Sequence, residues 1–156
     1  MKTFSGDIWS LLPERMIVIP LNQGWSTSGV GILGKGLALQ AAQRFPKLPL
    51  WWGELCQKLR ENTPVLVYPD GPLILFPTKP LNKRLPWYSW RSPSTTGLIE
   101  QGLGQLIQLP ITKPIAVPLL GCGAGGLHEA DVLPLFERYV KDDRFTLVRP
   151  GGGTQT

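Results

Sequence analysis

Two glycine-rich loops are the stretches of this sequence best suited to hold a ligand. The first covers residues 29–36, where four of eight positions are glycine, and the second covers residues 121–127. Glycine lets the backbone approach a ligand closely, and each loop precedes a predicted helix whose first N–H groups lack partners. Such N–H groups and the helix dipole attract anions, which predicts a bound phosphate or pyrophosphate. The alternative is that the glycines only allow the chain to turn.

Two polar side chains stand where predicted strands end. Asn22 follows the apolar run 16–21, and Lys79 follows the run 73–77. Ligands of open α/β sheets bind at the carboxyl ends of strands. A lysine whose pKa is lowered by burial can act as a nucleophile or a base. For Lys79 the alternative is an ordinary solvated lysine.

Alternating apolar runs and amphipathic stretches predict the elements that position these residues. We expect a short first strand and its exit over 3–9, strands at 16–21, 115–120 and 145–148, and a hairpin of 65–69 and 73–77 around Asp70-Gly71. Helices are expected over 36–44, over 49–60 with Leu50, Leu55 and Leu59 buried, over 96–109 with Ser94 or Thr95 as cap, and over 129–140. The last strand, 145–148, is expected to close the sheet.

This order predicts an α/β fold with a mixed central sheet flanked by helices on both faces. Both glycine loops follow strands, so they are expected at one edge of the sheet, where a single cleft would suit a ligand with two phosphates. We expect one domain over residues 1–150 and a disordered tail over 151–156.

Composition narrows the function classes. The chain has 156 residues, two cysteines, one histidine and a net charge of +5. It lacks an apolar run of membrane-spanning length and an apolar signal core, so we expect a cytoplasmic protein without a membrane contact. The few cysteines and the single histidine predict no metal site and no cofactor. The positive charge fits an acidic or nucleic-acid partner, or a solvated basic surface.

The loop 80–94 interleaves basic and aromatic residues, namely Lys83, Arg84, Arg91, Trp87, Tyr88 and Trp90. Positive charge with flat rings is how proteins hold single strands, so Arg84 and Trp87 are candidate substrate contacts and single-stranded DNA a candidate partner. The alternative is that the rings pack over the core. Trp51 and Trp52 are expected in the core or on a helix face.

Four motifs, in this order along nearly the whole chain, resemble the macrodomain family. They are Gly6-Asp7-Ile8, the strand ending in Asn22, the loop 29–36 with Leu37-Ala38-Leu39-Gln40, and the loop 121–127. Gly34-Lys35-Gly36, Phe76-Pro77-Thr78-Lys79 and Gly121-Cys122-Gly123 are similar to the branch with the DarG antitoxin macrodomain and the terminal ADP-ribose protein glycohydrolase.

The resemblance implies ADP-ribose as the ligand and assigns each motif a role. Asp7 would accept a hydrogen bond from the adenine amino group, Ile8 would pack beside the base, and Asn22 would contact the distal ribose. The two loops would hold the diphosphate and the distal ribose through their backbones, at Gly31, Ile32, Leu33, Gly34 and Lys35 and at Gly121, Cys122, Gly123, Ala124, Gly125, Gly126 and Leu127.

The same branch implies that Lys79 is the catalytic residue. The protein-directed enzyme has an aspartate where this sequence has Gly125, which favours a nucleic-acid-linked substrate. His128 or Glu129 could supply a polar group instead, or could simply begin a helix. We therefore expect a hydrolase that removes ADP-ribose from DNA and acts as a monomer. The alternatives are a non-catalytic ADP-ribose reader and a hydrolase of protein-linked ADP-ribose or ADP-ribose 1''-phosphate.

Overall fold

One six-stranded sheet organises the computed structural model, which describes residues 1–151. Its order is β1-β6-β5-β2-β4-β3. The strands are β1 (Lys2–Ser5), β2 (Met16–Asn22), β3 (Leu66–Val67), β4 (Leu73–Lys79), β5 (Ile115–Pro118) and β6 (Phe145–Arg149). All neighbouring pairs are parallel except β3 with β4, which is the antiparallel hairpin predicted around Asp70-Gly71. The mixed α/β sheet is therefore confirmed.

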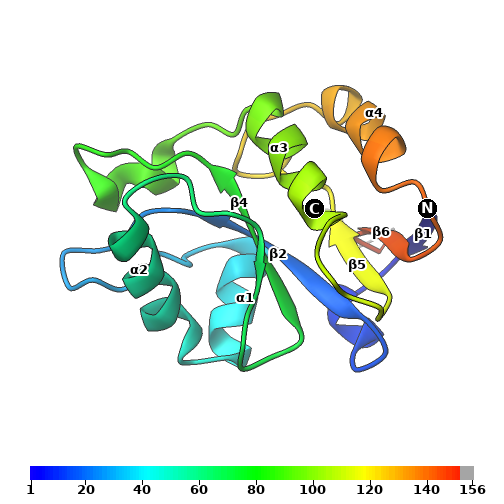
Figure 1. Ribbon diagram of the computed structural model, residues 1–156, viewed down its shortest axis with the longest axis horizontal. Helices are drawn as coiled ribbons and strands as arrows, with labels where there is room; N and C mark the ends of the chain where they lie inside the picture. Colours follow the sequence, from blue (N-terminus) through cyan, green and yellow to red (C-terminus); the bar gives the residue numbers. More distant parts are fainter. Residues whose placement is uncertain (152–156) are drawn as a thin grey trace.

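Helices cover both faces of this sheet (Figure 1). The first face is covered by η1 (Ile8–Leu11), α1 (Gly36–Arg44) and α2 (Leu48–Leu59), and the second by α3 (Thr96–Leu106) and α4 (Glu129–Tyr139). A further short helix, η2 (Pro86–Arg91), lies in the loop between β4 and α3. No helix within residues 1–151 has the length and apolarity needed to span a membrane.

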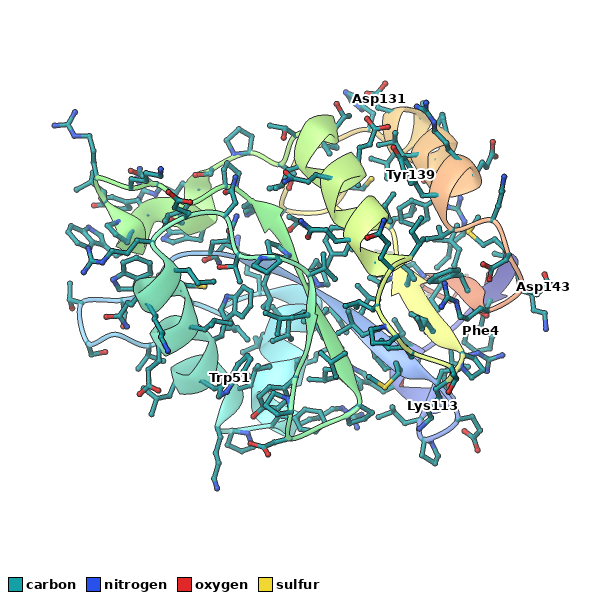
Figure 2. All side chains as sticks on the ribbon, viewed as in Figure 1. Phe4, Trp51, Lys113, Asp131, Tyr139 and Asp143 are labelled. Carbon is teal, nitrogen blue, oxygen red and sulfur yellow. The ribbon has the colours of Figure 1, made fainter. Side chains whose placement is uncertain are left out.

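Side-chain alternation along the central strands explains the two faces. Ile17 and Ile19 of β2 enter the core under α1 and α2, whereas Val18 between them enters the core under α3 and α4. Successive strand residues point to opposite faces, so a strand buried on both faces is a continuous apolar run. On the second face, the Tyr139 hydroxyl of α4 donates to Glu100 of α3 at 2.8 Å, which joins the two helices (Figure 2).

The helix α1 has the predicted bounds, but the predicted buried side of α2 is wrong. Leu50 and Leu59 are 50% and 41% exposed, and only Leu55 of the three predicted residues packs against the core, where it is partly buried. Leu48, Trp52 and Cys56 are buried instead. Those three residues are spaced by four, which places them on one face of the helix. Trp52 is in the core as expected, and Trp51 packs edge-on against Tyr68.

Two further features differ from expectation, and a third is not tested. The helix α3 ends at Leu106 rather than residue 109, and its cap is Thr95, which accepts a hydrogen bond from the Leu98 N–H. The strand β6 does not close the sheet, because β1 pairs with it on the outer side. The predicted tail, apart from Gly151, lies outside the described residues.

Candidate active site

The parallel strands bring the predicted site residues to one edge of the sheet. Asp7 follows β1, the loop 121–127 follows β5, the loop 29–36 follows β2, and Lys79 ends β4. The strands β5, β2 and β4 are neighbours in that order. Their carboxyl ends therefore place the two glycine loops and the Lys79 amine side by side, as the sequence predicts.

Lys79 is the chemically distinctive residue of this edge. It is the register partner of Asn22, just past an irregularity in the β2–β4 pairing. Its ammonium nitrogen Nζ donates to the Trp90 carbonyl oxygen at 2.7 Å. Burial lowers the pKa of Lys79, and the positive charge of Lys35 lowers this pKa further. The neutral amine is thus more accessible here than in a solvated lysine.

Asn22 fixes the first glycine loop to the end of β2. Its side-chain Nδ2 donates to the Ile32 carbonyl oxygen at 2.8 Å, and its Oδ1 accepts from the Gly24 N–H at 3.0 Å. Its own carbonyl accepts from the Trp52 indole N–H at 2.8 Å. The predicted contact of Asn22 with a ribose stays a prediction, but a positioning role is evident from these bonds.

The first glycine loop divides into an anchored part and an exposed tip. The Gly31 N–H donates to the Pro49 carbonyl at 2.8 Å, and Leu33 is buried in the core. A β-carbon on Gly53 of α2 would lie 2.4 Å from the Gly29 carbonyl, so helix and loop are in direct contact. Gly34 and Lys35 are exposed, and Lys35 immediately precedes α1. The tip is therefore the part of this loop available to an anion.

The second glycine loop is closed on itself by a backbone hydrogen bond, and three of its amides have no partner within residues 1–151. The Leu127 N–H donates to the Gly121 carbonyl at 2.9 Å, and Gly121 has a φ of +78°, which favours glycine. Within residues 1–151, no acceptor is found for the N–H groups of Cys122, Gly123 and Ala124. Successive unpaired N–H groups form an anion-binding concavity.

Ser94 lies directly under this second loop. Its N–H donates to the Gly125 carbonyl at 3.0 Å, and its side chain is nearly completely buried. The hydroxyl oxygen has no hydrogen-bond partner within the described residues. A serine just before a helix is also what a helix cap would look like in the sequence. The residue type therefore could not predict the contact of Ser94 with the second loop.

Asp7 lies in a shallow hollow at the start of η1. The hollow is lined by Asp7, Trp9, Gln40, Gln43 and Arg44. One carboxylate oxygen, Oδ1, accepts from the Trp9 N–H at 3.0 Å, and no hydrogen bond to Oδ2 is found within residues 1–151. Asp7 thus caps the turn, and its predicted hydrogen bond with a ligand amine stays a prediction. Ile8 beside it is buried in the core.

His128 and Glu129 stand at the start of α4. Glu129 forms an ion pair with Arg149 of β6, and His128 precedes the first helical residue with an exposed side chain. Glu129 and Asp131 in the first turn complement the helix dipole. These contacts agree with the alternative that Glu129 simply begins a helix. A substrate contact of His128 stays a prediction.

Gln23 is a site residue that sequence reasoning missed. It is fully buried, and its Nε2 donates to the Lys79 carbonyl at 2.9 Å while its Oε1 accepts from the Thr63 N–H at 2.6 Å. It therefore holds the backbone of Lys79. Its only sequence signal is its place directly after Asn22, because a buried glutamine has no distinguishing pattern.

Solved structures share this fold over nearly the whole chain. The macrodomain of Mycobacterium tuberculosis DarG is 31% identical, with a TM-score of 0.67 and coverage of 96% of this chain and 97% of that one. The macrodomain of Thermus aquaticus DarG is 26% identical, with a TM-score of 0.71 and 97% coverage of both chains. No protein-family model matches the chain. The chain belongs to the macrodomain family and is similar to its DarG members.

Two further relatives carry functional names. A Mycobacterium tuberculosis protein named DNA ADP-ribosyl glycohydrolase is 36% identical over 114 residues, which are 66% of this chain and 30% of that protein. The chain thus spans under a third of this curated relative. Thermosipho africanus DarTG, solved in complex with ADP-ribose, is 24% identical with a TM-score of 0.68, covering 92% of this chain and 40% of that one.

Proposed function

We propose that this protein binds ADP-ribose at the strand edge and hydrolyses the N-glycosidic bond that joins ADP-ribose to a DNA base. The observation that carries the proposal is the Lys79 amine, whose lowered pKa and position beside Asn22 suit it to act at a sugar carbon. The name of the Mycobacterium tuberculosis relative supports DNA as the carrier of the ADP-ribosyl group.

The exposed amides of the two loops account for the diphosphate. The Cys122, Gly123 and Ala124 N–H groups would donate to one phosphate, and the tip at Gly34 and Lys35 would hold the other. The amides of Gly31, Gly126 and Leu127 already have acceptors, so these three residues would not donate backbone N–H groups to the diphosphate as first expected. The free oxygen of Asp7 would accept from the adenine amino group.

Lys79 would act at the anomeric carbon of the distal ribose. In hydrolysis the carbon–nitrogen bond breaks, the base keeps the electron pair and receives a proton, and water supplies the hydroxyl of the released ADP-ribose. In one route the ribose ring opens at its C–O bond and that oxygen takes a proton; the neutral Lys79 amine then adds to the anomeric carbon, the base leaves with a proton, and water displaces the amine so that the ring closes. In the other route water attacks the anomeric carbon while protonated Lys79 donates its proton to the departing base. A pKa below the ordinary lysine value makes both forms accessible.

The second loop supports a DNA-linked over a protein-linked substrate, because it lacks the aspartate of the protein-directed enzyme. An ideal β-carbon on Gly125 would lie 2.5 Å from the Gly121 carbonyl, so an acidic side chain has no room at this position. The protein-directed chemistry that uses such a side chain is therefore disfavoured. The proposal includes neither a metal nor a redox cofactor, so turnover should survive treatment with EDTA.

The test compares wild type, Lys79→Ala and the surface control Lys58→Ala on three substrates. These are ADP-ribosylated single-stranded DNA, ADP-ribosylated protein and ADP-ribose 1''-phosphate. We expect turnover of the DNA that Lys79→Ala abolishes and Lys58→Ala leaves unchanged, while calorimetry shows ADP-ribose binding in all three proteins. ADP-ribose binding without any turnover would instead identify a reader, and preferential turnover of protein or of the phosphate ester would overturn the DNA assignment.

A further inference from the structure

The short helix η2 exposes three aromatic side chains, and the backbone carbonyl of one of them, Trp90, accepts from the Lys79 amine. We use the name η2 surface for four residues of η2, namely Trp87, Tyr88, Trp90 and Arg91. The three rings are each about 40% exposed. Exposed apolar area is unfavourable in water at about 25 cal/mol per Å². Such rings gathered at a site edge therefore suggest a partner that covers them.

Hydrogen bonds and packing fix the position of the η2 surface next to the sheet. The Asn82 side-chain oxygen accepts from the N–H groups of Arg84 and Leu85, and the Asn82 N–H donates to the hydroxyl of the buried Ser89. A β-carbon on Gly24 would lie 2.1 Å from the Pro86 carbonyl, so η2 rests directly on the backbone that follows β2. The rings are thus exposed by a defined helix.

The segment that carries these rings has charge of only one sign. Between Asp70 and Glu100 the sequence has no acidic residue, and it has four basic residues: Lys79, Lys83, Arg84 and Arg91. The guanidinium of Arg91 stacks over Tyr88 at 4.7 Å and over Trp90 at 4.9 Å from the ring centres. None of these four cations takes part in a salt bridge within residues 1–151. The positive charge is therefore available to an anionic partner.

The η2 surface is joined to the reacting centre by one hydrogen bond. The Trp90 carbonyl accepts from Lys79 Nζ at 2.7 Å, so the surface begins where the amine is held. A chain passing over the rings would arrive at the position proposed for the sugar–base bond. Bases can stack on exposed rings, and phosphates can bind to the cations. Both interactions are independent of which base is present.

We propose that the η2 surface binds the single-stranded DNA that flanks the ADP-ribosylated base, with bases stacked on Trp87 and Trp90 and a phosphate at Arg91. This inference rests on the proposed function. It adds a surface that would favour a DNA strand over an isolated nucleoside as the substrate. A duplex would keep its bases stacked on each other and so unavailable to the rings.

The experiment compares two substrates with the same scissile bond. One is a single-stranded oligonucleotide with one ADP-ribosylated base, and the other is the ADP-ribosylated mononucleoside. Trp87→Ala should lower kcat/KM for the oligonucleotide about tenfold or more, through KM, because one stacked base is lost. The mononucleoside should be cleaved equally by wild type and variant. Leu50→Ala, which removes an exposed side chain on α2, should change neither.

A second measurement isolates the charge. Binding of a labelled, unmodified oligothymidylate is measured by anisotropy over a range of salt concentrations. Arg91→Ala should reduce the slope of log affinity against log salt by about 0.7, because a single-strand phosphate contact contributes about that much. Lys58→Ala on α2 should leave the slope unchanged. Poly-glutamate should bind more weakly than the oligonucleotide and should not respond to Trp87→Ala.

The outcomes separate this inference from the proposed function. If wild type cleaves oligonucleotide and mononucleoside equally well, or if Trp87→Ala impairs both alike, the strand-binding surface is wrong while the hydrolase stands. If wild type cleaves neither substrate, the proposed hydrolase activity is wrong. Even then, binding of the unmodified oligonucleotide by wild type but not by Trp87→Ala supports the η2 surface as a strand-binding site. Equal binding by both proteins overturns it.

Discussion

The hydroxyl oxygen of Ser94 lies 2.2 Å from the point that a β-carbon on Gly125 would occupy. The same β-carbon would meet the Gly121 carbonyl at 2.5 Å, and neither neighbour can move freely, because Ser94 is buried and Gly121 accepts from the Leu127 N–H. The tight fit at Gly125 therefore fixes the shape of the second loop and orients its unpaired amides.

Gly125→Ala should accordingly distort the loop. We expect a loss of about 1–3 kcal/mol in the free energy of unfolding, which is typical of overpacking, and weaker ADP-ribose binding. Gly97→Ala is the matched control, because nothing lies within 4 Å of its β-carbon position in α3. Urea unfolding and calorimetry give the two readouts. Equal stability and affinity for Gly125→Ala and wild type would show that the contact does not shape the loop.

The pH dependence of turnover should report the Lys79–Lys35 pair. Burial and then the charge of Lys35 lower the pKa of Lys79. Removing that charge in Lys35→Met stabilises the protonated amine, so the pKa of Lys79 rises. If the neutral amine attacks, the rate increases with pH through this pKa, and the rise should move to higher pH in Lys35→Met. Lys58→Met should not move it, and a shift to lower pH in Lys35→Met would contradict the assignment.

Gln23 should support activity without touching the substrate. Gln23→Ala leaves the buried Thr63 N–H without its acceptor and the Lys79 carbonyl without its donor. A buried group left unpaired costs about 1–3 kcal/mol, so urea unfolding should show a loss of that order. We also expect a lower kcat with ADP-ribose affinity retained. Gln108→Ala, at an exposed position, is the control, and unchanged stability and kcat in Gln23→Ala would remove Gln23 from this role.

The sequence predicted which edge of the sheet carries the site, because the local sequence patterns there agree with the topology of the fold. The run ending at Asn22 is a strand buried on both faces, and the glycines that follow it precede a helix with the expected bounds. The Asp-Gly hairpin placed Lys79 at the end of its strand. Parallel strands then bring these ends together, which is a property of the fold class rather than of any one residue.

Other features depend on contacts that no local pattern encodes. Leu50 and Leu59 are nine residues apart and so lie on opposite sides of α2, and both are exposed, whereas the face with Trp52 meets the core. The Gly31 amide donates to the carbonyl of Pro49, which lies in α2, beyond the helix α1 that follows the loop. The burial of Gln23 and Ser94 results from tertiary packing, so residue type gave no signal for Gln23 and indicated only a possible helix cap for Ser94.

Cysteine labelling should map the ligand onto the second glycine loop. Cys122 lies in this loop and is half-buried, and its pKa is raised by burial and then by Glu129 and Asp131. Cys56 is an internal control, because burial raises its pKa to about 11. With N-ethylmaleimide in mildly alkaline buffer, mass spectrometry should find Cys122 modified first, since the thiolate reacts and access is needed. ADP-ribose should slow this modification in wild type and in Lys79→Ala alike. Labelling of Cys122 at an unchanged rate under saturating ADP-ribose would place the diphosphate elsewhere.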